Sequence, residues 1–271
     1  MTIKTRNTFI AIFMFVSLAI ILGIGILTGL QYFFGTFTSP DDTEGFFLIK
    51  TALTKFSFLS VVISIFLLLI YVFISYLYIN VEFEKTQSTE IIYFSIFLMG
   101  CILEATRLAV PINDLWNSSS TLAIFCTRTV LLGRYISVFS LLLAVICSSQ
   151  EYRQYVEQNI FILFVISLAI SIFFPVNSGK IRNVCIMELG FHHVFQTGQV
   201  IIILLTWFSE FLQTITKKIK NKIPIGLILL SLGYFILREA FCYLFMAIGF
   251  LLLMLGTFIY LKDLHKQYLW N

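Results

Sequence analysis

Apolar residues run along the chain in eight long stretches, which short polar or turn-rich segments separate. The hydrocarbon core of a bilayer is about 30 Å thick, and an α-helix of about 20 apolar residues crosses it. The pattern therefore predicts an all-α, polytopic membrane helix bundle that forms one integral-membrane domain over residues 1–271. The expected helices cover residues 8–34, 50–79, 90–111, 120–147, 157–176, 186–214, 222–240 and 242–262.

The stretch from Lys222 to Lys262 decides the helix count. One continuous helix of these roughly 40 residues would measure about 60 Å, which exceeds the hydrocarbon thickness. Two helices that meet near Arg238–Tyr243 fit the membrane and give eight crossings, with seven as the alternative. The run over residues 8–34 is too long for the core of a signal peptide, so we expect it to be the first helix.

Basic residues in the short loops predict the orientation. If the N-terminus is cytoplasmic, the run "KKIKNK" from Lys217 to Lys222 and the basic C-terminal segment also lie on the cytoplasmic side. We therefore expect both termini in the cytoplasm and the protein in the cell membrane. The third helix of each half carries charged residues, which raises the possibility of a 4+4 repeat of the kind found in transporters.

Composition excludes several classes of protein. Hydrophobic residues make up 59% of the chain and charged residues 12%, about half the charged share of a soluble domain. The net charge of +4 indicates no nucleic-acid partner. The five cysteines are widely spaced and form no C-x-x-C pair, so neither a zinc site nor a disulfide framework is expected. No metal, haem or other cofactor is expected.

The predicted helix 186–214 carries a continuous polar stripe. At 100° per residue its polar side chains fall within one wedge, and such a stripe must face protein or water, because lipid would leave the polar groups unsatisfied. Interhelical hydrogen bonding is one interpretation, and the lining of a binding cavity, which we favour, is the other. The stripe consists of Glu188, His192, Gln196, Gln199, Thr206, Glu210 and Gln213, with Glu188 and His192 spaced for pairing.

Charged residues also lie inside the predicted third and fourth helices. Glu104 and Arg107 are three apart on one face of a helix. Arg128 is close enough to the membrane surface for its side chain to reach it. Arg134 lies too deep for that and needs a buried carboxylate, for which Glu104 and the stripe are the candidates.

Arg238 and Glu239 stand side by side in an apolar stretch. We expect each to pair across helices, Arg238 with Glu104 and Glu239 with Arg107 or Arg128. A slight excess of arginine over glutamate would suit a small anion such as a carboxylate or phosphate. The predicted ligand-binding residues are Glu104, Arg107, Arg128, Arg134, Glu188, His192, Gln196, Gln199, Arg238 and Glu239.

These features favour an outward-facing polar pocket that recognises a small anionic or polar solute, in a sensor-like or receptor-like protein. The C-terminal "YLKDLHKQYLWN" places Leu264, Tyr268 and Leu269 on one side of a helix, which suits docking on a protein partner or on membrane lipid. A small-solute transporter that uses the stripe as its path is the alternative. A structural membrane subunit and an intramembrane enzyme with Cys101 or His192 are further alternatives.

Overall fold

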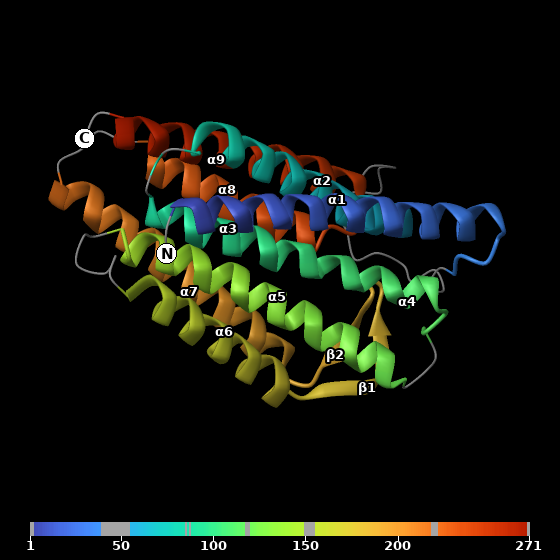
Figure 1. The fold of residues 1–271 in the computed structure, drawn as a ribbon. Coiled ribbons are helices and arrows are strands. Elements are labelled where there is room, and N and C mark those ends of the chain that lie inside the picture. The colour runs from blue at the N-terminus through green and yellow to red at the C-terminus, as the bar shows by residue number, and fades with distance from the viewer. Residues whose placement is uncertain are drawn as a thin grey trace.

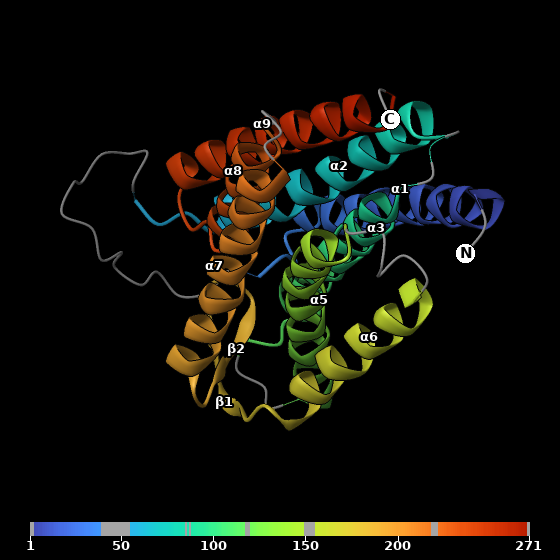
Figure 2. The same ribbon diagram turned by 90° about the vertical axis from the view of Figure 1, so that its left-hand side faces the viewer.

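A computed structural model describes residues 3–38, 55–84, 86, 88–116, 120–148, 155–217 and 222–269. These residues form a helix bundle with one two-stranded hairpin, shown in Figure 1 and, after a quarter turn, in Figure 2. The elements are α1 (Ile3–Phe33), α2 (Phe58–Glu82), α3 (Thr89–Ile102), the 3₁₀ helix η1 (Leu103–Leu108), α4 (Ala109–Ile112), α5 (Thr121–Ile146), α6 (Val156–Phe173), β1 (Val176–Arg182), β2 (Ile186–Leu189), α7 (His192–Lys217), α8 (Ile223–Arg238) and α9 (Tyr243–Leu269).

The predicted all-α membrane bundle is confirmed as a fold class. Seven helical segments are long and apolar enough to cross a membrane, with α3, η1 and α4 counted as one segment. These lengths and compositions identify an integral membrane protein. Helix α8 has only 16 residues, about 24 Å at 1.5 Å per residue. The count of eight crossings and the 4+4 repeat stay predictions.

The hairpin and the chain termini lie at opposite ends of the bundle (Figure 1). The end that carries β1, β2 and α4 is called the hairpin end below, and the other the terminus end. Helix α8 packs against α9 along most of its length, and α5 contacts α3, α6 and α7. Helix α5 therefore connects the two sides of the bundle (Figure 2).

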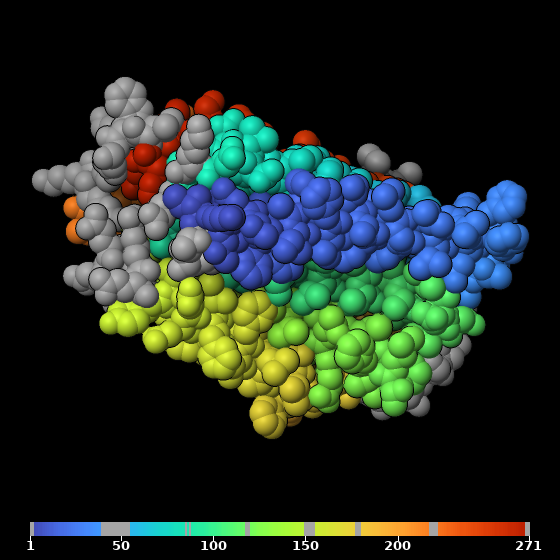
Figure 3. Space-filling view, in the orientation of Figure 1, coloured from blue at the N-terminus to red at the C-terminus, as the bar shows by residue number. Residues whose placement is uncertain are grey.

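Large apolar side chains cover the outer surfaces of α1, α6 and α7. Helix α1 lies across the face of the molecule in Figure 3, and its exposed residues include Phe15 and Ile26. Phe161 on α6 and Phe208 on α7 are exposed in the same way. A soluble protein rarely leaves such contiguous apolar surface in water, so these faces are suited to lipid.

Glycines allow α8 and α9 to approach each other closely. A Cβ atom on Gly233 would lie 2.3 Å from the backbone nitrogen of Leu253, and one on Gly256 would lie 2.3 Å from that of Leu230. No side chain fits in that space, so the two backbones are in direct contact. In lipid there is no hydrophobic force between helices, so membrane helices associate mainly through close van der Waals packing. Small residues allow that packing because they let the backbones approach.

Proline interrupts the third span where its charged residues lie. Pro111 has no backbone N–H, and in a regular helix its ring would clash with the carbonyl of Arg107, four residues earlier. The chain adopts a 3₁₀ helix over Leu103–Leu108 just before it. In a 3₁₀ helix, residues three apart stand directly above one another. The side chains of Glu104 and Arg107 therefore leave the 3₁₀ helix on the same side.

The predicted helix 186–214 is wrong at its start. Residues 186–189 form β2, which pairs antiparallel with β1, and helix α7 begins at His192. Pro175 follows α6, and the backbone N–H of Gly190 donates to the Pro175 carbonyl at 3.0 Å, which closes the segment on itself. Cys185 turns the chain between the strands with a φ of 59°. The contact between Pro175 and Gly190 and the turn at Cys185 therefore produce a hairpin where the apolar residues alone predicted a helix.

Candidate functional site

Five charged residues from three parts of the chain meet inside the bundle near the hairpin end. Glu104 and Arg107 come from η1, Arg134 from α5, and Arg238 and Glu239 from the end of α8. We call these five residues the charged cluster. Each of the first four keeps at most 4% of its side chain exposed, whereas Glu239 keeps 27%. Glu239 is therefore the exposed edge of the cluster.

Arg134 joins the two carboxylates of the cluster. Its Nε donates to Glu104 Oε1 at 2.7 Å, and its Nη1 donates to Glu239 Oε1 at 2.7 Å. The neighbouring residue explains how Arg134 reaches this position, because a Cβ atom on Gly133 would lie 2.6 Å from the carbonyl oxygen of Gly100 in α3. Helices α5 and α3 thus touch one turn from the Glu104 carboxylate.

Arg107 connects the cluster to the hairpin and to α8. Its Nε and Nη2 donate to the carbonyl oxygen of Val184 at 2.9 and 2.7 Å. Its Nη1 donates to the carbonyl oxygen of Arg238 at 2.8 Å and lies 3.2 Å from Glu104 Oε2. The hairpin turn is therefore held against the bundle by one buried guanidinium.

Arg238 is almost entirely buried yet incompletely paired. Its Nη2 donates to the side-chain oxygen of Gln199 on α7, and its Nε lies 3.8 Å from Glu239 Oε1, too far for a hydrogen bond. Its Nε and Nη1 have no hydrogen-bond partner among the described residues. Its guanidinium carbon lies 4.0 Å from the centre of the Phe235 ring. The ring compensates part of the charge, but it satisfies neither donor.

Two more donors near Arg238 lack partners. The Nε2 of Gln199 and the hydroxyl of Tyr234 make no hydrogen bond to any described residue, and both side chains are fully buried. Tyr234 lies four residues before Arg238 in α8, with its ring centre 5.4 Å from the guanidinium carbon. Buried polar groups are normally paired, so four unpaired donor groups in one place require an explanation.

The cluster carries a positive excess. Its three arginines stand against two glutamates, which leaves one positive charge within these five residues. A buried charge is costly unless it is paired and hydrogen-bonded. The excess and the unpaired donors meet at Arg238, so the arrangement suits one additional acceptor with negative charge.

Glu239 follows the last residue of α8 and lies outside the helix. Burial by itself raises the pKa of its carboxyl, but the guanidiniums of Arg134 and Arg238 outweigh this and lower the pKa to about 2. Glu239 is therefore ionised at neutral pH. Glu239 is therefore one of the two negative charges that stand against the three arginines of the charged cluster.

Six of the ten predicted ligand-binding residues come together. The five residues of the charged cluster meet, and Gln199 joins them through Arg238. The predicted partner Glu104 for Arg134 is confirmed. The other predicted pairs are wrong, because Glu104 binds Arg134 and Arg107 and not Arg238, while Glu239 binds Arg134. Of the two charges on η1, Glu104 contacts α5 through Arg134, whereas Arg107 contacts the hairpin and the end of α8.

The remaining four predicted residues lie elsewhere. Arg128 contacts α6, where its carbonyl accepts from Ser171 at 2.6 Å, and it joins no ion pair within the described part of the chain. Glu188 stands on β2, so the predicted Glu188–His192 helical pair is wrong. His192 Nε2 lies 3.2 Å from Arg182 Nη1 instead. Gln196 is half-buried one turn along α7.

The polar face of α7 turns toward protein, as predicted for its helical members. Gln199 and Thr206 are buried, and Gln213 donates to the carbonyl of Val145 at 2.7 Å. On the other side Leu204 and Phe208 are exposed. Hydrogen bonds between helices account for Gln213, whereas Gln199 faces the charged cluster.

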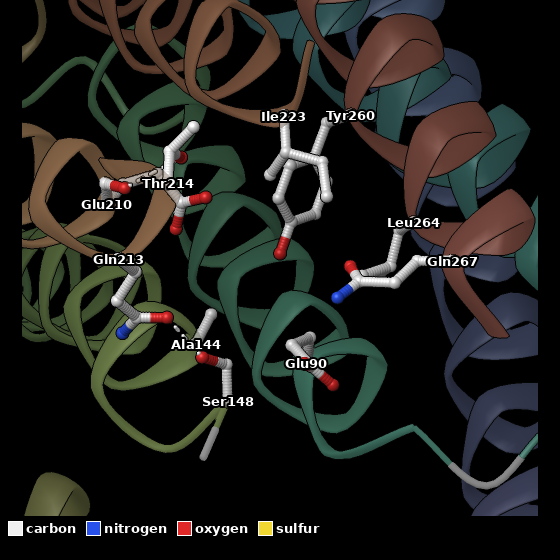
Figure 4. Close-up of a pocket in the computed structure, with 10 residues that line it drawn as sticks. All are labelled: Glu90, Ala144, Ser148, Glu210, Gln213, Thr214, Ile223, Tyr260, Leu264 and Gln267. Carbon is white, nitrogen blue, oxygen red and sulfur yellow. Dashed lines mark hydrogen bonds between the residues drawn. The ribbon is translucent and has the colours of Figure 1, made fainter. Parts of the chain in front are cut away.

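A second polar site lies at the terminus end and was not predicted. A cavity of about 40 Å³ lies between the ends of α3, α5, α7, α8 and α9, and its lining residues are drawn in Figure 4. Glu210 and Gln213 belong to the predicted polar stripe, and Glu90 stands in the first turn of α3, but nothing in the sequence shows that these residues meet. The cavity, called the terminus-end pocket below, is lined by Glu90, Ala144, Ser148, Glu210, Gln213, Thr214, Ile223, Tyr260, Leu264 and Gln267.

The predicted docking face of the C-terminal helix is turned inward. Leu264 is 2% exposed and belongs to the main apolar core. The hydroxyl of Tyr268 donates to Glu90 Oε2 at 2.5 Å. The side chain of Leu269 lies outside the described residues. Leu264 and Tyr268 therefore stabilise the bundle.

No protein-family model matches the sequence, and a search of curated proteins finds no match either.

Proposed function

We propose that this membrane protein recognises a small anionic or polar solute at the charged cluster, as a sensor-like or receptor-like protein. The observation that supports the proposal is Arg238. Its guanidinium is buried, two of its donors are unpaired, and the cluster around it has one excess positive charge. A planar carboxylate or a phosphate accepts two parallel N–H groups of a guanidinium.

The neighbouring groups suit the same ligand. Gln199 Nε2 and the Tyr234 hydroxyl offer two further donors near Arg238, and Glu239 is the exposed member of the cluster. An anion bound to Arg238 would replace the missing acceptors without breaking the Arg134 ion pairs. Discrimination against neutral analogues would be strong, because these would leave buried donors unpaired.

Sensing is favoured by the connections of the cluster. Arg107 ties the hairpin carbonyl of Val184 and the carbonyl of Arg238 to η1. A ligand that draws Arg238 toward itself would therefore act on the hairpin, η1, α7 and α8 together. Sensor-like function then requires two arrangements of these contacts that the ligand stabilises differently.

Calorimetry on the purified protein in nanodiscs tests recognition, with small mono- and dicarboxylates and inorganic phosphate as probes. Arg238→Gln removes the charge and should weaken binding tenfold or more, since hydrogen bonds to charged groups contribute about 1.5–3 kcal/mol. Arg128→Gln is the matched control, because Arg128 lies outside the cluster, and should bind as the wild type does. If Arg238→Gln leaves affinity unchanged, the site is wrongly assigned.

Transport is the second candidate, and one observation favours it. The polar face of α7 reaches from Gln199 at the cluster to Glu210 and Gln213 in the terminus-end pocket. Flux of the bound solute into proteoliposomes separates the two functions. A transporter accumulates the solute inside, whereas a sensor binds it without flux.

The proposal includes the cell membrane as location, eight crossings and cytoplasmic termini. All five native cysteines are buried, so an introduced cysteine can be labelled selectively. Lys180 and Lys262 are exposed at the hairpin end and the terminus end. A membrane-impermeant maleimide on intact cells should label Lys180→Cys and leave Lys262→Cys unlabelled. If only Lys262→Cys is labelled, the termini lie outside the cell. If both variants are labelled equally, the two positions do not lie on opposite sides of the membrane.

A further inference from the structure

The charged cluster contains two carboxylates that are held in different ways. Glu104 is fully buried, and both of its oxygens are engaged: Oε1 accepts from Arg134 Nε at 2.7 Å, and Oε2 lies 3.2 Å from Arg107 Nη1. Glu239 lies outside the helices and is the exposed member of the cluster. Glu104 is therefore a fixed part of the packing, whereas Glu239 stands at the exposed edge.

Glu239 lies beside the guanidinium that the proposed function assigns to the ligand. Its Oε1 accepts from Arg134 Nη1 at 2.7 Å and lies 3.8 Å from Arg238 Nε. The second distance is too long for a hydrogen bond, but it is short for two charges in a largely buried region, where solvent screens little. An anion that bonds to Arg238 is therefore repelled by the Glu239 carboxylate at short range.

One guanidinium of the cluster lacks a carboxylate of its own. Arg107 is paired with Glu104, and Arg134 contacts both carboxylates at 2.7 Å. Arg238 has no carboxylate within hydrogen-bond distance among the described residues, and its Nη1 has no hydrogen-bond partner there. The cluster thus lacks one negative charge. A singly charged anion restores neutrality, whereas a doubly charged one reverses the sign of the buried charge, which is costly.

The hairpin contributes one further cation near the cluster. Arg182 of β1 is close enough for its charge to act on Glu239. Its Nη1 lies 3.2 Å from His192 Nε2, and it forms no ion pair within the described part of the chain. Arg182 is half-buried and thus more exposed than the three arginines of the cluster, so solvent screens its charge more strongly. The charge around Arg238 is therefore set mainly by the cluster itself.

We propose that the charged cluster selects singly charged anions, such as a monocarboxylate, and that Glu239 is the residue that determines this specificity. The inference rests on the proposed function. Arg238, the Tyr234 hydroxyl and Gln199 Nε2 attract the first charge of the ligand, and Glu239 repels a second one. Without the charge of Glu239 the cluster lacks two negative charges, so it should then accept doubly charged anions.

Calorimetry in nanodiscs with malonate and malonamate tests this specificity at neutral pH. The two probes have the same carbon chain, but malonamate carries an amide in place of one carboxylate and therefore one negative charge instead of two. The wild type should bind malonamate at least about tenfold tighter than malonate, because two like charges a few ångströms apart in a buried site repel by more than a tenfold change in affinity represents. Glu239→Gln should abolish or reverse this preference.

Glu82→Gln is the matched control and should keep the wild-type preference, because Glu82 lies 3.8 Å from His265 at the terminus end, away from the cluster. A wild type that binds malonate as tightly as malonamate overturns the inference, and this comparison does not require any variant to fold. An unchanged preference in Glu239→Gln overturns the role of Glu239. Both results leave recognition intact, because an anion is bound. If the wild type binds neither a carboxylate nor inorganic phosphate, the proposed function is wrong and the specificity with it.

Discussion

Helix α8 takes part in two regions that are held together differently. Along Gly233 it lies against α9 with backbone touching backbone, and no charge is involved. At its end, Arg238 and Glu239 enter the charged cluster, where burial of charge opposes folding unless each group is paired. The first region needs no further partner, because its contacts are made by backbone and apolar atoms. The second also stabilises the fold through the ion pairs of Arg134, but it has unpaired donors around Arg238, which is why we assign recognition to it.

The largest expected effect is the loss of Arg134. Arg134→Met leaves Glu104 and Glu239 without their closest cation and should lower the free energy of unfolding by about 3–5 kcal/mol. Unfolding in detergent by chemical denaturant measures it. Arg128→Met, on the same helix but outside the cluster, should change little. If Arg134→Met leaves the free energy of unfolding unchanged, the fold does not depend on the charged cluster, and a purely structural subunit is favoured.

Packing between α8 and α9 gives the second largest effect. Gly233→Ala places a methyl group against the Leu253 backbone, and overpacking of this kind costs about 1–3 kcal/mol. The melting temperature should fall, while binding of the solute by the protein that stays folded is unchanged. Gly29→Ala is the control, because a Cβ atom there meets nothing within 4 Å. If Gly233→Ala weakens solute binding at unchanged stability, the two regions are not separate.

The smallest effect concerns acid. The folded pKa of Glu239 is about 2, below the ordinary value of 4.5. Its contribution to stability is therefore fully present above pH 4.5 and is lost as the pH falls toward 2. Stability of Glu239→Gln should be lower at neutral pH and should depend less on pH in this range. Glu82→Gln should keep the acid dependence of the wild type. If the stability of Glu239→Gln depends on pH in the same way as that of the wild type, the arginines do not lower the pKa of Glu239.

Much of the fold could be predicted from hydropathy, because each apolar run must satisfy its backbone inside its own helix. The spacing of Glu104 and Arg107 also predicted their shared face. The hairpin was missed because Ile186–Leu189 is as apolar as a helix of the same length, and its short turn carries no glycine. The contact partners of Arg238 and Glu239 could not be deduced, since one guanidinium in a membrane can satisfy any carboxylate that the packing brings near.

The sequence by itself determined that the chain is a bundle of membrane helices, that α7 has one polar face, and that buried arginines need carboxylates. These are local consequences of desolvation, which acts on every residue wherever it lies. Only the tertiary structure decided which charges meet, since the approach of α3 and α5 at Gly100 and Gly133 and the end of α8 set the distances. It also brought Glu90, Glu210 and Tyr260 to one cavity, because helix ends far apart in the chain converge only when all the helices pack.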